Sequence, residues 1–173
     1  MVVHETPRLH LKTWDRSDFD DFAVLARDPR VMRYIAEGEP WSDARIGWFM
    51  GLQYAYQETL GYCNWRLVDR ATGEMVGICG LAPLKDWDAP EIGWWLKPDH
   101  WGQGFALEAA RHTLQAAATQ YHLEKIIGRA NHLNERSLNL FHKLGMTYDQ
   151  TLDTHTGAQV DVYCINLNRV DPI

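Results

Sequence analysis

The sequence predicts a mixed α/β (α+β) domain built on a mainly antiparallel central sheet. The chain has 173 residues, a length that one hydrophobic core can serve. Its composition, with 46% hydrophobic and 23% charged residues, is typical of a globular protein. Segments with strand and helix patterns follow one another in the order βααβββαβαββ, without repeats or Pro/Gly/Ser-rich linkers. We therefore expect residues 1–173 to form a single domain.

The elements of the first half are predicted by the period of their apolar residues and by the residues at their ends. Apolar residues that alternate with polar ones predict a strand, and apolar residues three or four apart predict a helix. Ser17 and Ser42 are expected to cap two helices, which Pro29 and Gly61 end. The elements expected here are a strand at 9–13, helices at about 17–28 and 42–61, and strands at 63–68 and 75–82.

The second half of the chain is expected to alternate strands and helices. Pro98 stops the first of its strands, and Gly145 is expected to end its last helix. The expected elements are a strand at 91–96, a helix at 105–121, a strand at 125–130, a helix at 134–144, and strands at 146–152 and 160–167 joined by a turn at 155–157.

Charge, hydropathy and cysteine usage exclude several classes of protein. A net charge of −6 and a pI near 5.7 argue against nucleic-acid binding. The apolar stretches are far shorter than the ~18 residues of a membrane span, and no signal segment is recognisable. The cysteines lack a CxxC pair and the histidines lack HxxxH or HExxH spacing, so we expect neither a disulfide framework nor a metal. We therefore expect a cytoplasmic protein.

The segment Gly102-Gln103-Gly104-Phe105-Ala106 is the first candidate for a binding site. It follows a strand and opens a helix, where unpaired N–H groups and the helix dipole attract phosphate. A dinucleotide fingerprint would need glycine where Leu107 stands, and no P-loop string occurs. Glu108 is an ordinary acidic residue of a first helical turn. On this motif alone, a phosphate site and a plain strand–helix turn are equally acceptable.

Several segments, taken in order, resemble the GNAT acyl-CoA N-acyltransferases. They are E-T-P-R-L-H-L at 5–11, the strand at 91–96, W-G-Q-G-F-A at 101–106, N-E-R-S at 134–137 and K-L-G-M at 143–146. The first looks like the opening strand of the ribosomal-protein N-terminal acetyltransferase branch. The family's phosphate loop reads (Gln/Arg)-x-x-Gly-x-(Gly/Ala), so Gly104 and Ala106 match, whereas Trp101 stands in place of Gln or Arg. The resemblance covers nearly the whole chain and implies a GNAT-like fold, with a sheet of about seven strands splayed in the middle and about four flanking helices.

The resemblance also implies an activity, namely transfer of the acetyl group of acetyl-CoA to a primary amine by direct attack. The CoA diphosphate would lie on the amides of about residues 103–107, and the pantetheine arm would pair with the exposed backbone of the splayed strand. The residues that it places at this cosubstrate are Trp94, Trp95, Leu96, Trp101, Gly102, Gln103, Gly104, Phe105, Ala106, Leu107, Asn134, Ser137 and Phe141.

Ser137 and Glu91 are the expected catalytic residues. Phe141 stands where many family members carry a tyrosine acid, so Ser137 is expected to hydrogen-bond the departing thiolate or to relay a proton. Otherwise Ser137 makes an ordinary contact in the first turn of its helix. Glu91 matches the place where some members hold a general base that acts through water, or else it is a solvated edge glutamate. Asn134 is expected both to cap its helix and to contact pantetheine.

The acceptor site is expected between the loop at 34–41, the loop at 85–89 and the final hairpin. Acidic side chains there favour a cationic amine, although aromatic residues are more often core. A protein N-terminus, a polyamine- or aminoglycoside-like molecule and an amino-acid derivative all stay open, as do a monomer and a homodimer. A non-catalytic acyl-CoA-binding module is the alternative function. The candidate acceptor residues are Tyr34, Glu37, Glu39, Trp41, Asp86, Trp87, Asp88 and Glu91.

Five of the eight tryptophans fall between the second strand and the glycine loop. We expect some of them to form the walls of the cosubstrate and acceptor cleft, and others to be core. They are Trp65, Trp87, Trp94, Trp95 and Trp101.

Overall fold

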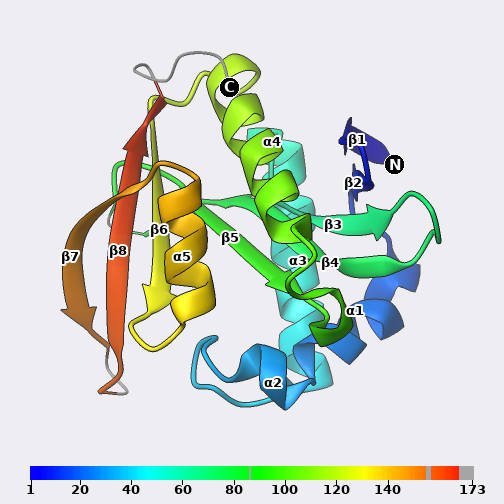
Figure 1. Ribbon diagram of the computed structural model, residues 1–173. Coiled ribbons are helices and arrows are strands. Elements are labelled where there is room, and N and C mark those ends of the chain that lie inside the picture. The colour runs from blue at the N-terminus through cyan, green and yellow to red at the C-terminus, as the bar shows by residue number, and fades with distance from the viewer. Residues whose placement is uncertain (86, 155–156, 168–173) are drawn as a thin grey trace.

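A computed structural model describes residues 1–85, 87–154 and 157–167. Within them a single eight-stranded sheet forms the centre of the molecule (Figure 1). The strands are β1 (Val2–Glu5), β2 (Leu9–Lys12), β3 (Asn64–Asp69), β4 (Met75–Ala82), β5 (Glu91–Leu96), β6 (Lys125–Asn131), β7 (Thr147–Asp153) and β8 (Gln159–Asn166). The helices are α1 (Phe19–Ala26), α2 (Pro29–Met32), α3 (Asp43–Leu60), α4 (Phe105–Thr119) and α5 (Glu135–Lys143), with short 3-10 turns η1 (Arg16–Asp18) and η2 (Pro98–His100).

The sheet has the strand order β1-β2-β3-β4-β5-β6-β8-β7. All neighbours pair antiparallel except β5 and β6, which run parallel. The mixed and mainly antiparallel architecture expected from the element order is therefore confirmed, with one strand more than expected.

Helices cover both faces of the sheet (Figure 1). The Trp95 ring of β5 stacks on Phe22 of α1 and Phe49 of α3, so these helices cover one face. The neighbouring Trp94 ring packs instead on Phe141 of α5, which lies on the opposite face. Successive side chains of a strand point to opposite faces, so β5 contributes to both layers of the core.

Local signals in the sequence account for most helix ends. Ser42 caps α3 by accepting a hydrogen bond from the Arg45 amide at 3.4 Å. Gly61 ends the same helix in the left-handed region, with φ of 78°, which glycine reaches without strain. Gly145 has the same role after α5, with φ of 75°. These predictions are confirmed.

The region before α1 differs from expectation. The prediction that Ser17 caps the first helix is wrong, because Ser17 lies inside η1. Asp15 caps this turn by accepting from the Ser17 amide at 3.0 Å, and the Asp18 carboxylate accepts from the Asp15 amide at 2.5 Å. Pro29 follows the end of α1 as expected, but it also opens α2 as its first residue.

Strand β1 was not expected from the sequence, and it pairs antiparallel with β2. It carries His4, which is buried against α4 with its ring 5.0 Å from that of His112. His112 is therefore half-buried. In the expected turn at 155–157, residues 155 and 156 lie outside the described part of the chain.

Strands β5 and β6 separate after a short common stretch (Figure 1). They pair only at Glu91 with Ile127 and at Ile92 with Gly128. On its other side, β5 stays paired with β4 as far as Leu96. The sheet is thus splayed at the carboxyl end of β5, where α4 and α5 both begin nearby.

Candidate active site

The splayed end of β5 presents unpaired backbone groups toward β6. The Lys97 amide donates to the Val76 carbonyl at 2.9 Å, on the β4 side. Because backbone groups of successive residues point to opposite sides of a strand, those of Trp94 and Leu96 point toward β6. No ladder pair joins these two residues to β6 in the described ranges. The Leu96 carbonyl instead accepts from the Trp101 indole at 2.8 Å, which leaves the Trp94 groups and the Leu96 amide open.

The loop before α4 is shaped by two glycines in the left-handed region. Gly102 has φ of 75° and Gly104 has φ of 82°, values that glycine adopts readily. Gly104 is the N-cap of α4 and provides no side-chain cap. The first backbone bond of the helix runs from the Glu108 amide to the Gly104 carbonyl at 3.0 Å. For residues 103–107, all of them described, no backbone amide donates a hydrogen bond, so a row of backbone donors and the positive end of the helix dipole fit a diphosphate.

The loop is anchored at both ends by side chains. The Trp101 indole holds it to β5, and the Gln103 side-chain amide donates to the Asp99 carbonyl at 2.7 Å. The guanidinium of Arg136 in α5 lies 4.6 Å from the centre of the Trp101 ring. This cation–π contact joins the start of α5 to the glycine loop across the splay.

The first turn of α5 carries Asn134 and Ser137. Asn134 caps the helix, and its side-chain oxygen accepts from the Ser137 amide at 3.3 Å. The Ser137 side chain is half-buried, and among the described residues its hydroxyl has no hydrogen-bond partner. A hydroxyl that no protein group engages can bond a ligand atom.

Comparison with known proteins shows which family this chain belongs to. Residues 8–147 match the family model described as "Acetyltransferase (GNAT) domain". The chain belongs to the GNAT acetyltransferase family. The uncharacterized protein YkkB of Bacillus subtilis is 30% identical over 152 residues, which cover 85% of this chain and 86% of that protein. As a GNAT protein the chain is an acetyl-CoA-dependent N-acyltransferase, and the amides of 103–107 fit the phosphates of that cosubstrate.

Solved GNAT structures share the fold. RimL, the ribosomal L7/L12 alpha-N-protein acetyltransferase solved with CoA, superposes with a TM-score of 0.81 at 15% identity, covering 96% of this chain and 98% of its own. Spermidine N-acetyltransferase from Vibrio cholerae, solved with CoA and spermine, superposes with a TM-score of 0.77 at 19% identity, covering 93% of this chain and 96% of its own. At such identities the likeness concerns the fold.

Of the residues expected at the cosubstrate, the aromatic ones are placed differently from one another. Phe141 is 1% exposed and lies in the core between Trp94 and Tyr163, with ring centres 5.1 and 5.0 Å apart. A Cβ on Gly128 would come 2.3 Å from the Phe141 ring, so the glycine makes room for it. Trp95 points to the face covered by α1 and α3. The burial of Phe141 argues against direct contact with the cosubstrate.

Glu91 lies at the closed end of the splay and is paired with Arg129. Two guanidinium nitrogens of Arg129 donate to the two carboxylate oxygens of Glu91, each at 3.0 Å. Glu91 is therefore no isolated edge glutamate, and a water or amine at this GNAT site would share its carboxylate with Arg129.

The residues expected at the acceptor fall into separate places. Glu37 pairs with Arg45 at 2.5 Å, and the Arg45 guanidinium lies 4.7 Å from the centre of the Trp41 ring, which is only 7% exposed. Tyr34 carries Arg33 over its ring at 5.2 Å. Glu39 is exposed, and the Asp88 carboxylate lies 3.7 Å from the Lys125 ammonium. Trp87 packs on a small cluster around Ile127 and Val162. Asp86 lies outside the described residues.

Other polar and reactive groups have structural roles. Trp65 is fully buried and donates to the Gln57 side chain at 2.9 Å, so it is one of the tryptophans that belong to the core. Burial raises the pKa of the Cys63 and Cys79 thiols to about 12, so these thiols are packing groups and not nucleophiles.

Across the described residues, no group of three or more His, Cys, Asp or Glu could hold a metal ion. No helix in the described part is long and apolar enough to cross a membrane.

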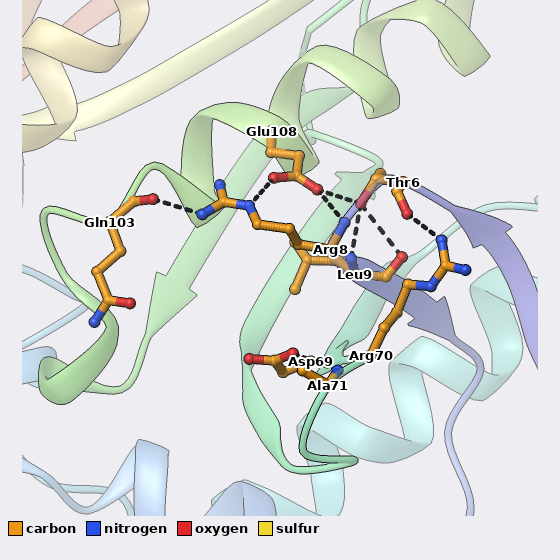
Figure 2. A network of polar contacts seen from close by, with 8 residues as sticks. All are labelled: Thr6, Arg8, Leu9, Asp69, Arg70, Ala71, Gln103 and Glu108. Atoms are coloured by element: carbon orange, nitrogen blue, oxygen red, sulfur yellow. Dashed lines mark hydrogen bonds and ion pairs between the residues drawn. The ribbon is translucent and has the colours of Figure 1, made fainter.

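Reasoning from sequence missed several charged residues around this GNAT site. Arg8 and Glu108 bind each other beside the glycine loop (Figure 2). Arg129 pairs with Glu91, and Arg136 covers Trp101. Arg8 and Arg136 stand inside segments that resemble the family, but only their contacts reveal what they do.

Proposed function

We propose that this GNAT protein transfers the acetyl group of acetyl-CoA to a cationic primary amine, by direct attack and without a covalent enzyme intermediate. One observation carries the proposal: three kinds of open group border one splay. They are the backbone groups of Trp94 together with the Leu96 amide, the backbone amides of residues 103–107, and the hydroxyl of Ser137. The strand groups can pair with an extended pantetheine arm, the amides can bind a diphosphate, and the hydroxyl can bond a thioester sulfur.

Each group has a distinct part in this proposal. Acetyl-CoA supplies an activated acetyl thioester. The amides at the start of α4 bind its diphosphate. The Trp94 backbone groups and the Leu96 amide bind the pantetheine arm, and an amide there stabilises negative charge on the thioester carbonyl oxygen. The Ser137 hydroxyl donates a hydrogen bond to the sulfur as it leaves, and the thiolate takes up the proton that the attacking nitrogen loses, so that CoA departs as the free thiol.

The amine must be neutral to attack, so a proton has to be taken up. Amines have reference pKa values of ~8 at a chain N-terminus and ~10 in lysine, and are therefore mostly charged at neutral pH. We assign Glu91 as the acceptor of this proton, through a water molecule. Its pairing with Arg129 holds the carboxylate in one orientation beside the splay. Glu91→Gln should lower the rate of acetyl transfer at pH 7, and the rate of this variant should recover at high pH, where the amine is already neutral. Glu74→Gln is the control, since Glu74 lies in the exposed turn before β4, and it should leave the rate unchanged.

The acceptor is proposed to be a cationic amine, either a polyamine-like molecule or a protein N-terminus. The names of the two structural neighbours describe these two kinds of acceptor for those proteins. The net charge of −6 favours a cation as well. The cytoplasmic location and the monomeric or dimeric state stay predictions.

Release of free thiol from acetyl-CoA, measured with a panel of amines, tests the proposal. Spermidine, a peptide with a free N-terminus and the same peptide with a blocked N-terminus form a matched set. Release with a free amine, and none with the blocked peptide, is expected. If CoA binds but no amine releases thiol above background, the chain is the non-catalytic binding module and the proposal fails.

A further inference from the structure

The glycine loop, residues 102–107, has no basic residue of its own, but an arginine distant in the sequence binds to it. Residues 102–107 read G-Q-G-F-A-L. Arg8, just before β2, reaches the loop across a separation of 95 residues (Figure 2). A binding site for a diphosphate normally gains from a cation, so this contact is the first place to look for one.

Arg8 is held in one orientation by contacts at different atoms. Its Nε donates to Oε2 of Glu108 at 2.6 Å, and its backbone amide donates to Oε1 of the same residue at 2.8 Å. One terminal nitrogen donates to the Gln103 carbonyl at 2.8 Å. The guanidinium carbon lies 4.4 Å from the centre of the Phe105 ring. These contacts use the planar fork of arginine, which lysine does not have.

The segment just before β2, which carries Arg8, is itself held by hydrogen bonds. The Arg70 side chain donates to the Thr6 carbonyl at 2.7 Å, and the Arg70 amide donates to the Arg8 carbonyl at 2.9 Å. The Thr6 hydroxyl donates to Glu108 at 2.6 Å. Figure 2 shows these side chains converging between β2, the turn after β3 and the first turn of α4. Arg8 therefore links the glycine loop to a part of the sheet that is itself fixed by hydrogen bonds.

Glu108 creates a need for this arginine. Burial raises the pKa of its carboxyl, but hydrogen bonds from Thr6 and Arg8 outweigh this and lower the pKa overall. Glu108 is thus a carboxylate in the first turn of α4, close to the amides that fit a diphosphate. An unpaired negative charge there would oppose phosphate binding, and Arg8 offsets it.

The second terminal nitrogen of Arg8 lies close to Gly104. It lies 3.4 Å from the point where a Cβ on Gly104 would be, and among the described residues it has no hydrogen-bond partner. The Arg8 side chain is 45% exposed. Gln103 sits between two flexible glycines, so fixing its carbonyl removes freedom that a bound diphosphate would otherwise have to remove.

We propose that Arg8 is a positioning residue for the diphosphate of acetyl-CoA. Through the Gln103 carbonyl and the Phe105 ring it holds the loop with its amides turned outward, and it neutralises Glu108 beneath them. This inference rests on the proposed function, because it assumes that the loop binds the diphosphate.

The test compares Arg8→Gln and Arg8→Lys with the wild-type chain. Calorimetry gives the affinity for CoA, and kcat/KM is measured with acetyl-CoA and with acetyl-pantetheine, which has no diphosphate. Both variants should bind CoA about tenfold more weakly. Their kcat/KM should fall with acetyl-CoA and stay unchanged with acetyl-pantetheine. Arg27→Gln is the matched control, since Arg27 is similarly exposed, at 49%, and pairs with Asp43 away from the loop.

Three results would overturn the inference. Unchanged CoA affinity in Arg8→Gln would remove Arg8 from the site. Wild-type affinity in Arg8→Lys would show that charge alone suffices, without the fork. Equal losses with both acetyl donors would mean general damage to the fold. A wild-type chain that binds no CoA would instead refute the proposed function, so the two failures are distinguishable.

Discussion

Gly104→Glu is expected to weaken CoA binding about a hundredfold in a protein that still folds. Gly104 has φ of 82°, and a residue with a Cβ costs about 1–2 kcal/mol in that conformation. The larger effect is electrostatic, because the new carboxylate would stand at the N-terminus of α4 where the diphosphate is proposed to lie. Two unit charges about 5 Å apart at an effective dielectric of about 20 repel by about 3 kcal/mol, which weakens binding about a hundredfold.

The matched control for this variant is Gly73→Glu. Gly73 has φ of 76° in the turn between β3 and β4, and its Cβ would meet nothing within 4 Å. Both substitutions therefore introduce similar backbone strain and the same charge, and each should lower the melting temperature by a few degrees. Only Gly104→Glu should lose CoA in calorimetry. Unchanged CoA affinity in Gly104→Glu, or an equal loss in Gly73→Glu, would refute the assignment of the loop.

Three further predictions concern catalysis, pH and packing. Ser137→Ala should lower kcat about ten- to hundredfold and leave the CoA affinity within twofold, and a wild-type rate would exclude Ser137 from the mechanism. Burial, and then the charge of His112, lower the pKa of His4 from 6.5 to about 4. The folded state thus favours the neutral form of His4. Its contribution to the free energy of unfolding is therefore present above pH 6.5, and about 3 kcal/mol of it is lost as the pH falls from 7 to 4. Urea unfolding of His4→Gln should show a smaller loss, and a wild-type pH dependence in this variant would contradict the assignment. Gly128→Ala should destabilise the fold by about 1–3 kcal/mol, because its Cβ would lie 2.3 Å from the Phe141 ring; an unchanged urea midpoint would show that the ring moves freely.

Prediction from sequence succeeded where the cause is local. The strand at 91–96 and the helix start at Phe105 match the structure, because Pro98, Gly102 and Gly104 act on their own backbone. It failed for β1, whose Val2–Glu5 segment shows no alternation and becomes a strand by pairing with β2. It also failed at Ser17, because the neighbouring Asp15 and Asp18 cap each other.

The candidate site divides in the same way. The glycine loop and Ser137 were found from short motifs, whose spacing is set within one turn of chain. The pairing of Glu91 with Arg129 joins residues 38 positions apart, and that of Arg8 with Glu108 joins residues 100 apart. No local pattern encodes such partners, because they depend on which strands become neighbours.

The sequence by itself determined a mixed α/β fold and the loop that fits a diphosphate, because periodicity, capping and backbone freedom act over a few residues; the family followed from the resemblance of its ordered motifs. The tertiary structure alone decided which groups surround that loop. Packing buried Phe141 and Trp65, turned Trp94 and Trp95 to opposite faces, and brought Arg8 onto Gln103. Burial and long-range pairing arise only when the whole sheet assembles, so the tertiary structure determines which charged groups lie at the site.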